Sequence, residues 1–496
     1  MLRTTGTRSA IWGAVWGAVM LGVVPLVVSP LGAQAPDRSS PPELGPAPTL
    51  SLPPISERTL ANGLRVIYMP KHNVPLVQVN LVVKVGSVAD PDNRPGLASM
   101  VAAMLDEGAG GRSALELAEE IDFLGASIRV SGGRHFITVA LHAPVSKLEP
   151  ALDLLADVVL RPTFADEELD RQRRQRLTTI MQWRDEPRAI ARVIYDRTLY
   201  GERHPYGRQT MGTAQSMGAM SRDDLRQFHG RYFVSNNAAV VIVGDISERD
   251  AIFHLERVFG GWEAGAVPEH RFGEARQVRR RQVILVDKPG AAQSEIRIGR
   301  IGVARSTADY YPLLVMNTIL GGSFASRLNQ KLREEKQYTY GARSSFAFRL
   351  MAGPFTASAA VQTEVTDSAL VEFMRELNAI LEDVSDEEMT RARNFVALRF
   401  PSRFQAVSQI AGALENLFEY DLQPGYFNNF VQNVLSVTKE DVLRVARQHI
   451  DPERMAIIVV GDRSVIEDGV RALNLGPVRV LSVEDVLGPP PEVSGN

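Results

Sequence analysis

Val240-Val-Ile-Val-Gly-Asp245 has a near copy further along the chain, Ile457-Ile-Val-Val-Gly-Asp462, and this pair decides the fold. Each run predicts a buried strand, because consecutive apolar, mostly β-branched residues end at a glycine. Gly244 and Gly461 lie 217 residues apart. Two further pairs keep nearly the same spacing: Arg222-Asp-Asp-Leu225 with Lys439-Glu-Asp-Val442, and Asp166-Glu-Glu-Leu169 with Asp386-Glu-Glu-Met389. Such an internal repeat indicates two homologous domains.

The pattern within the first repeat predicts a mixture of strands and helices. Val77, Val79 and Leu81 alternate with polar residues, which is typical of a half-buried strand. Further strands are expected at 128–130, 136–141 and 238–243, and helices at 113–123, 147–160, 166–183 and 223–232. Sheets with helices packed on one face make α+β the natural class, with mainly antiparallel strands in each domain.

The composition narrows the classes of function. The chain has 496 residues, of which 45% are hydrophobic and 23% charged, as expected for a globular protein. Its net charge of −3 gives no electrostatic argument for binding nucleic acid. Because it has no cysteine, a disulfide scaffold, thiolate catalysis and thiolate metal sites are excluded.

The N-terminus predicts export from the cell. Arg3 and Arg8 precede an apolar run over 11–28, and Ala33-Gln-Ala35 has the small-x-small form of a cleavage site. We therefore expect a signal peptide at 1–35 and a location in the bacterial periplasm. Cleavage after Ala33 and an uncleaved membrane anchor stay open as alternatives, and no span is expected in the mature chain. Residues 36–55 are rich in Pro and Ser and are expected to form an extended tether.

One helix is expected from Gly96 to Gly108. Apolar residues form a buried stripe along it: Leu97, Met100, Val101, Met104 and Leu105. Gly108 is a natural helix stop. Between the apolar positions lie Ser99, Ala102 and Ala103, which offer one hydroxyl and two methyl groups.

Several motifs together resemble the M16 (insulinase/pitrilysin-type) zinc peptidase family, in its bacterial two-domain form. They are Asn62-Gly-Leu64, His204-Pro-Tyr-Gly207 with Gly212-Thr213, Tyr232 with Asn236-Asn237, and Val286-Asp-Lys-Pro-Gly-Ala-Ala-Gln-Ser294. The likeness covers the chain from residue 57 to about 485. It implies two M16-type (LuxS/MPP-like) domains at 56–263 and 282–488, a linker at 264–281 and a tail at 489–496.

The resemblance also shows what this chain lacks. Family members carry Gly-Leu-Ala-His-x-x-Glu-His on the helix that begins here at Gly96, so Ser99, Ala102 and Ala103 replace two zinc ligands and the general base. The third ligand of the family, a glutamate, aligns with Thr179; Glu168 and Glu186 are alternatives that restore no histidine pair. Because zinc requires imidazole, carboxylate or thiolate ligands, we expect no metal in this chain.

The histidines suggest no substitute metal site. No two of them lie within four residues of each other: His72, His135, His142, His204, His229, His254, His270 and His449. The closest pair, His135 and His142, would point to opposite faces of one strand.

A second family feature is retained. The block from Leu320 to Gly341 resembles the M16 Arg/Tyr segment, with a helix expected over 323–335 followed by a strand. The resemblance implies that Arg333 and Tyr340 bind the substrate carbonyl and its developing oxyanion, as guanidinium and phenol donors can. Taken without the family, the local sequence favours a helix-end ion pair and an aromatic strand residue. Tyr338 is the alternative functional tyrosine.

Three hypotheses follow. In the first, the chain is the non-catalytic subunit of a heteromeric M16-type zinc metallopeptidase, and a homologous partner subunit supplies zinc and the general base. The complex would degrade unfolded peptides that add as a strand to a sheet edge. In the second, the chain is a catalytically dead scaffold or peptide-binding protein. In the third, it is a peptidase with non-standard metal ligands.

Overall fold

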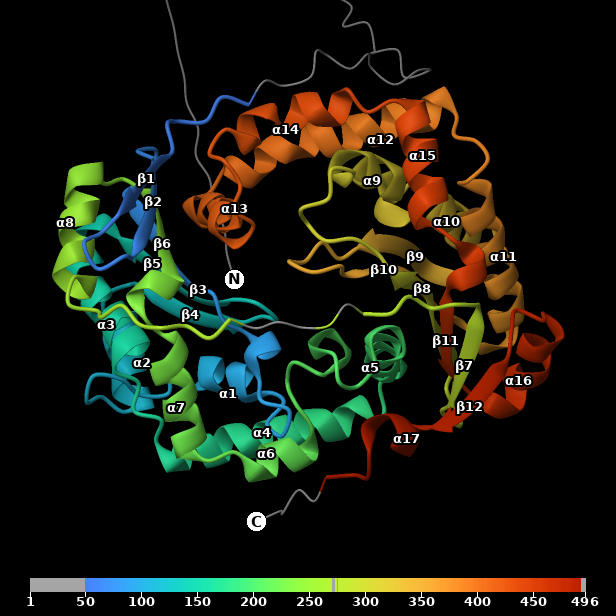
Figure 1. The fold of residues 1–496 in the computed structure, drawn as a ribbon, viewed down its shortest axis with the longest axis horizontal. Helices are drawn as coiled ribbons and strands as arrows, with labels where there is room; N and C mark the ends of the chain where they lie inside the picture. The colour runs from blue at the N-terminus through green and yellow to red at the C-terminus, as the bar shows by residue number, and fades with distance from the viewer. Residues whose placement is uncertain (1–49, 270–272, 274, 492–496) are drawn as a thin grey trace, which may run out of the picture. The chain divides into compact units, whose positions relative to one another are not determined.

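The two repeated runs form central strands of two six-stranded sheets (Figure 1). The computed structural model describes residues 50–269, 273 and 275–491. All the elements below belong to one unit, Ala47–Asn496. The predicted signal peptide, most of the tether and the end of the tail lie outside the described residues. No helix in the described part of the chain is both long enough and apolar enough to cross a membrane.

The first sheet has the strand order β1-β2-β6-β3-β5-β4. β2 and β6 are parallel, and the other neighbours are antiparallel. The bounds are β1 (Ser56–Thr59), β2 (Arg65–Pro70), β3 (Leu76–Val83), β4 (Ser127–Gly132), β5 (Ile137–Pro144) and β6 (Ala238–Gly244).

The second sheet has the order β12-β7-β11-β8-β10-β9. From β7 to β9 this order corresponds, strand by strand, to that from β2 to β4 in the first sheet. β7 is parallel to both β11 and β12, and the remaining pairs are antiparallel. The bounds are β7 (Gln282–Asp287), β8 (Gln293–Ile301), β9 (Thr339–Phe346), β10 (Pro354–Gln362), β11 (Ala456–Gly461) and β12 (Val478–Ser482). Two α+β domains of one kind, each with a mixed and mainly antiparallel sheet, are therefore confirmed.

Several helices begin where a side chain caps their first turn. Ser113, Ser221, Ser385 and Thr438 each accept a hydrogen bond from the third residue of the helix that follows, which caps free N–H groups. The helices before the second sheet are α1 (Leu97–Met104), α2 (Ala114–Phe123), α3 (Leu148–Leu160), α4 (Asp166–Trp183), α5 (Pro187–Tyr200), α6 (Ala214–Ala219), α7 (Arg222–Tyr232) and α8 (Glu248–Phe259).

The remaining helices lie in the second half of the chain. They are α9 (Tyr310–Asn317), α10 (Arg327–Asn329), α11 (Thr366–Ala379), α12 (Asp386–Arg399), α13 (Val407–Glu419), α14 (Tyr426–Leu435), α15 (Lys439–His449), α16 (Arg463–Ala472) and α17 (Val483–Leu487). Two π-helical turns interrupt them, η5 (Thr318–Gly322) and η6 (Gln330–Glu335). Such turns are rare and are frequent at functional sites.

Each sheet also receives a helix from the other half of the chain. α5 packs on β8 and β11, and α13 packs on β3 and β6 (Figure 1). The Tyr195 hydroxyl on α5 donates to the carbonyl of Phe355 and accepts from the hydroxyl of Thr356. The two domains therefore exchange one helix each, and both sheet faces are covered at these strands.

This exchange corrects one expectation. β3 was predicted to be half-buried, but Gln78 and Asn80 on its polar face are each only 5% exposed. The reason is α13, which begins more than 300 residues later and covers that face. The Asn80 amide meets the Glu415 carboxylate there and donates a hydrogen bond to it.

Candidate functional site

The helix that carries the zinc motif in the M16 resemblance is α1. Its residue Ser99 donates from its hydroxyl to the carbonyl of Gly96 at 3.0 Å. Ala102 is 3% exposed and faces β4, where a Cβ added to Gly132 would stand 2.9 Å from the Cβ of Ala102. Ala103 is partly exposed. Neither alanine has a donor atom for a metal.

An arginine faces the site instead. Arg176 on α4 donates to the Ser99 hydroxyl at 2.7 Å and to the Ser99 carbonyl at 2.6 Å. Burial lowers the pKa of this guanidinium to about 10. It therefore still carries a positive charge at neutral pH, held against the backbone of α1.

The counter-charge to Arg176 is Asp90, at the start of α1. Asp90 accepts hydrogen bonds from the backbone N–H groups of Gly96 at 2.6 Å and Ala98 at 2.7 Å. Burial raises the pKa of Asp90 to about 7, although these two bonds and the charge of Arg176 act in the opposite direction. Asp90 thus caps the helix and places an acid near the guanidinium.

The fourth position, Thr179, lies one turn after Arg176 on α4 and is partly exposed. Its hydroxyl donates to the carbonyl of Gln175, within its own helix, at 3.0 Å. The four positions that hold the zinc ligands and general base in the family thus offer two methyl groups and two hydroxyls here. The guanidinium of Arg176 already contacts one of these residues, Ser99. These residues do not fit a zinc ion. Within the described ranges, no group of three or more His, Cys, Asp or Glu side chains could hold a metal.

Arg333 lies on η6, in a segment that was predicted as a helix over 323–335. The helix is observed only in part: residues 323–326 are not helical, α10 spans three residues, and the π-helical η6 follows it to Glu335. Leu328 and Leu332 are buried, whereas Phe324 is 60% exposed. The Arg333 guanidinium lies 4.6 Å from the centre of the Phe324 ring and 3.3 Å from the carboxylate of Glu334.

Tyr340 lies near the start of β9 and is 90% exposed. Within the described residues, its hydroxyl has no hydrogen-bond partner. Tyr338, the alternative, is partly exposed and packs against the core of the second domain. Between η6 and β9 stands Gln337 with φ of 57°, a left-handed conformation that is uncommon outside glycine. This turn sets where Tyr340 lies relative to Arg333; the structure shows no direct contact between the two side chains among the described residues.

The outer edge of β9 is closed to an added strand. The backbone N–H of Ala342 donates to the side-chain oxygen of Asn329 at 3.2 Å. The carbonyl of Ser344 accepts from the side chain of Asn317 at 3.1 Å. In contrast, β4 at the edge of the first sheet pairs only with β5 among the described strands.

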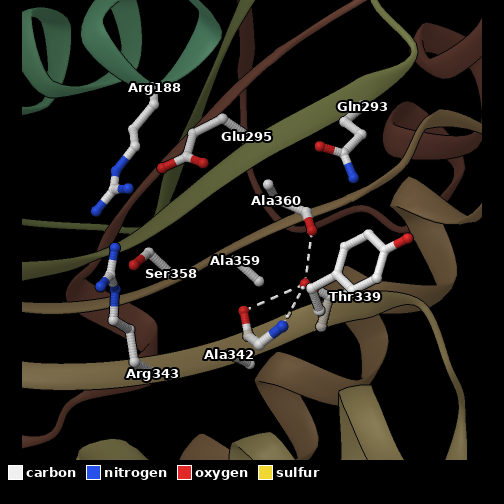
Figure 2. Close-up of a pocket in the computed structure, with 11 residues that line it drawn as sticks. Arg188, Gln293, Glu295, Thr339, Ala342, Arg343, Ser358, Ala359 and Ala360 are labelled. Carbon is white, nitrogen blue, oxygen red and sulfur yellow. Dashed lines mark hydrogen bonds between the residues drawn. The ribbon is translucent and has the colours of Figure 1, made fainter.

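A pocket of about 440 Å³ opens beside Tyr340, on the same sheet face as α5, where β10 and β9 extend beyond that helix. Figure 2 shows Arg188 from α5 and Arg343 from β9 with their guanidinium groups turned toward one another. Glu295 on β8 lies between these elements and forms an ion pair with Arg297 at 3.2 Å. Sequence reasoning missed Arg176, Arg188 and Arg343, because no local pattern separates them from ordinary surface arginines.

Comparison with known proteins finds two family models that match the chain between residues 65 and 396. Residues 65–214 match the model of the insulinase family (peptidase family M16), and residues 219–396 match that of the peptidase M16 inactive domain. The chain belongs to the M16 peptidase family. The family implied by the motifs at Asn62, His204 and Val286 is thus confirmed.

Relatives of this M16 chain cover most of its length. An uncharacterized zinc protease of Mycobacterium tuberculosis is 27% identical over 429 residues, which cover 85% of this chain and 96% of the relative. One from Mycobacterium leprae is 26% identical over 347 residues, covering 69% and 76%.

Solved structures agree on the fold. The crystal structure of a peptidase M16 inactive domain from Pseudomonas fluorescens has a TM-score of 0.78 at 26% identity and covers 82% of this chain and 98% of that chain. A protease from Helicobacter pylori has a TM-score of 0.78 at 19% identity, covering 83% and 100%.

Proposed function

We propose that this protein is the non-catalytic subunit of a heteromeric M16-type zinc metallopeptidase that degrades unfolded peptides. One observation carries the proposal. The residues at the family's zinc positions cannot hold the metal and one of them, Ser99, is bonded to Arg176, whereas the Arg/Tyr segment of the second domain remains exposed. A homologous partner subunit supplies the zinc and the general base.

The contribution of this chain is a pair of hydrogen-bond donors. Tyr340 presents an exposed phenol, and Arg333 has a side chain that is 39% exposed. In the complex, both donate to the carbonyl oxygen of the scissile bond and follow it as negative charge develops there. Donors placed where charge grows contribute more to the transition state than to the ground state. The greater exposure of Tyr340 favours it over Tyr338 for this role.

The closed edge of β9 bears on which subunit pairs with the substrate strand in this proposal. Unfolded peptides bind as an added strand through free backbone groups at a sheet edge. Because Asn317 and Asn329 occupy such groups on β9, the substrate strand does not add to this edge, and in this proposal it pairs with the partner's sheet. The Arg/Tyr segment then contacts the substrate with side chains only. Export to the periplasm remains part of the proposal and rests on residues 1–35.

A catalytically dead scaffold or peptide-binding protein is the second candidate. The pocket beside Tyr340 favours it, because this chain alone forms that pocket and none of the residues at the family's zinc positions lines it.

The decisive experiment purifies the tagged chain from the cell envelope of its own organism and identifies the chains that accompany it. We expect a stoichiometric partner that carries His-x-x-Glu-His and a peptidase activity that Tyr340→Phe reduces about 100-fold or more, the usual loss for one oxyanion donor. Tyr338→Phe is the matched control and should retain activity. A chain that arrives without such a partner and cleaves no unfolded peptide would establish the scaffold or peptide-binding role.

A further inference from the structure

The pocket beside Tyr340 has a floor of small side chains. Ser358 of β10 lies opposite both Arg297 of β8 and Arg343 of β9, and Ala360 lies opposite Glu295. Residues that alternate with these, such as Ile296 and Ala359, point into the core on the other face of the sheet. The small residues on the open face leave the space that larger side chains would fill.

The walls of the pocket carry excess positive charge. Arg188, at the first turn of α5, and Arg343 are exposed, and within the described residues neither guanidinium has a hydrogen-bond or ion-pair partner. The carboxylate of Glu295 is already paired with the Nε of Arg297. Three guanidinium groups thus surround one carboxylate.

The charges of this group act on one another. Burial raises the pKa of Glu295, although the charges of Arg297, Arg188 and Arg343 lower it. Burial also lowers the pKa of Arg297, and the charge of Arg188 acts in the same direction. The other carboxylate that acts on Arg297, Asp196, is already paired with Arg134 at 2.8 Å. Glu295 is therefore insufficient to neutralise the three cations, and two facing guanidinium groups repel each other unless an anion lies between them.

We propose that this pocket is a subsite for a carboxylate of the peptide, which Arg188 and Arg343 bind from opposite sides. The planar fork of arginine suits a carboxylate, because two N–H groups can donate to its two oxygens at once. The subsite rests on the proposed function in one respect: Tyr340 at its rim places it beside the scissile bond. The protein thereby selects unfolded peptides that carry an acidic residue near the cleavage site.

A peptide offers a carboxylate at two kinds of position, on an Asp or Glu side chain and at its C-terminus. Both are tested by fluorescence anisotropy on the whole chain without a partner. The probes are labelled, unstructured peptides of one length with Glu, Gln or Lys at the central position, each made with a free and with an amidated C-terminus.

We expect the Glu peptide to bind about 10-fold more tightly than the Gln peptide, equivalent to about 1.4 kcal/mol. The preference should weaken as salt increases, because the groups involved are exposed charges. A preference that follows the free C-terminus and ignores the central residue would assign the subsite to the terminal carboxylate.

Two kinds of variant locate the binding. Arg188→Gln and Arg343→Gln should each reduce the Glu-over-Gln preference several-fold, and Arg343→Glu should transfer it to the Lys peptide. Ala360→Leu should remove binding by filling the pocket with no change in charge. Arg279→Gln and Arg280→Gln remove exposed arginines of the linker and should leave the preference intact. Unchanged thermal unfolding midpoints would show that the variants fold.

The outcomes separate this subsite from the proposed function. Equal affinity for the Glu, Gln and Lys peptides, no binding of any of them, or a preference unaffected by the pocket variants would overturn the subsite. If the preference is found but no peptidase assembles with a partner, the subsite stands and the heteromeric peptidase is wrong. An active complex with no preference for acidic peptides would support the heteromeric peptidase and overturn the subsite.

Discussion

Arg176 reaches from α4 to Ser99 on α1 and donates to both its hydroxyl and its carbonyl, at 2.7 and 2.6 Å. In the M16 resemblance, Ser99 stands where a histidine would hold zinc. The guanidinium of Arg176 thus connects α1 and α4, the two helices that carry the zinc ligands in the family resemblance. A positive charge therefore occupies this position in the chain, and α1 is held to α4 by hydrogen bonds from a guanidinium.

This contact predicts that restoring the zinc ligands will be insufficient to restore zinc binding. A doubly charged ion about 5 Å from a guanidinium is repelled by about 7 kcal/mol at an effective dielectric constant of about 20. The variant Ser99→His, Ala102→Glu, Ala103→His, Thr179→Glu should bind zinc weakly. Adding Arg176→Ala should increase its affinity about 100-fold or more, measured by competition with a chelator.

Arg176→Ala alone serves as the control and should bind no more zinc than the unaltered chain. Stoichiometric zinc in the four-residue variant, with the same affinity whether or not Arg176 is present, would show that the guanidinium does not exclude the metal.

Local periodicity was enough to predict much of the fold. The apolar spacing of α4 and the run that forms β6 gave elements close to those observed, because these patterns depend on neighbours within a few residues. β3 was misjudged, since its polar face is covered by a helix that begins at Val407. A contact across such a separation leaves no trace in a strand's own sequence.

The site was predictable only where the family has a motif. Ser99 and Arg333 were found by their place in such motifs, whereas Arg176 is buried by a helix 77 residues earlier in the chain. Arg188 and Arg343 come from different domains and meet only because α5 packs on the second sheet. The irregular turns around Arg333 were missed as well, because its flanking residues also suit a regular helix.

The left-handed turn at Gln337 gives a prediction about stability. A non-glycine residue at positive φ costs on the order of 1 kcal/mol, which glycine does not incur. Gln337→Gly should keep or raise the free energy of unfolding by up to about 1 kcal/mol. Gln337→Val should lower it by about 1–2 kcal/mol, because a β-branched residue tolerates this conformation poorly.

Urea unfolding of the two Gln337 variants measures these changes. The exposed Gln405, which has φ of −88°, offers a matched site where Val should have a smaller effect. Equal destabilisation by Gly and Val at position 337 would indicate that the glutamine side chain matters and that backbone strain does not.

Phe324 gives a prediction about positioning. Its ring is 60% exposed and lies 4.6 Å below the guanidinium of Arg333, an arrangement worth about 0.5–1 kcal/mol at exposed sites. In the proposed complex, Phe324→Ala should lower kcat about 3-fold with little change in KM or in stability, because Arg333 becomes less well placed.

Phe324→Tyr keeps the ring and should restore kcat, which distinguishes positioning from a general loss of packing. The exposed Phe253→Ala on α8 is the matched control. If Phe324→Ala raises KM and leaves kcat intact, the ring contacts the substrate itself and does not act through Arg333.

The helix exchanged between domains predicts a dependence of stability on pH. Burial raises the pKa of Glu415 and of Glu419 on α13 to about 7, from 4.5. Between about pH 4.5 and 7 the folded state keeps protons that the unfolded chain has released, so stability falls as pH rises through this window and levels off above it. Asp90 also makes stability fall as pH rises, because burial raises its pKa to about 7 from 3.8.

The variant Glu415→Gln, Glu419→Gln should therefore be more stable than the unaltered chain at pH 8, by on the order of 2–3 kcal/mol, and nearly equal to it at pH 5. The amide that replaces the Glu415 carboxylate can still accept from Asn80, so the hydrogen bond to β3 survives the substitution. Urea unfolding at several pH values between 5 and 8.5 tests this, with the exposed Glu119→Gln as control. A residual slope from Asp90 is expected in the double variant. If the full slope of the unaltered chain persists there, the two glutamates of α13 are not its source, and the contact between α13 and β3 stays intact when they are charged.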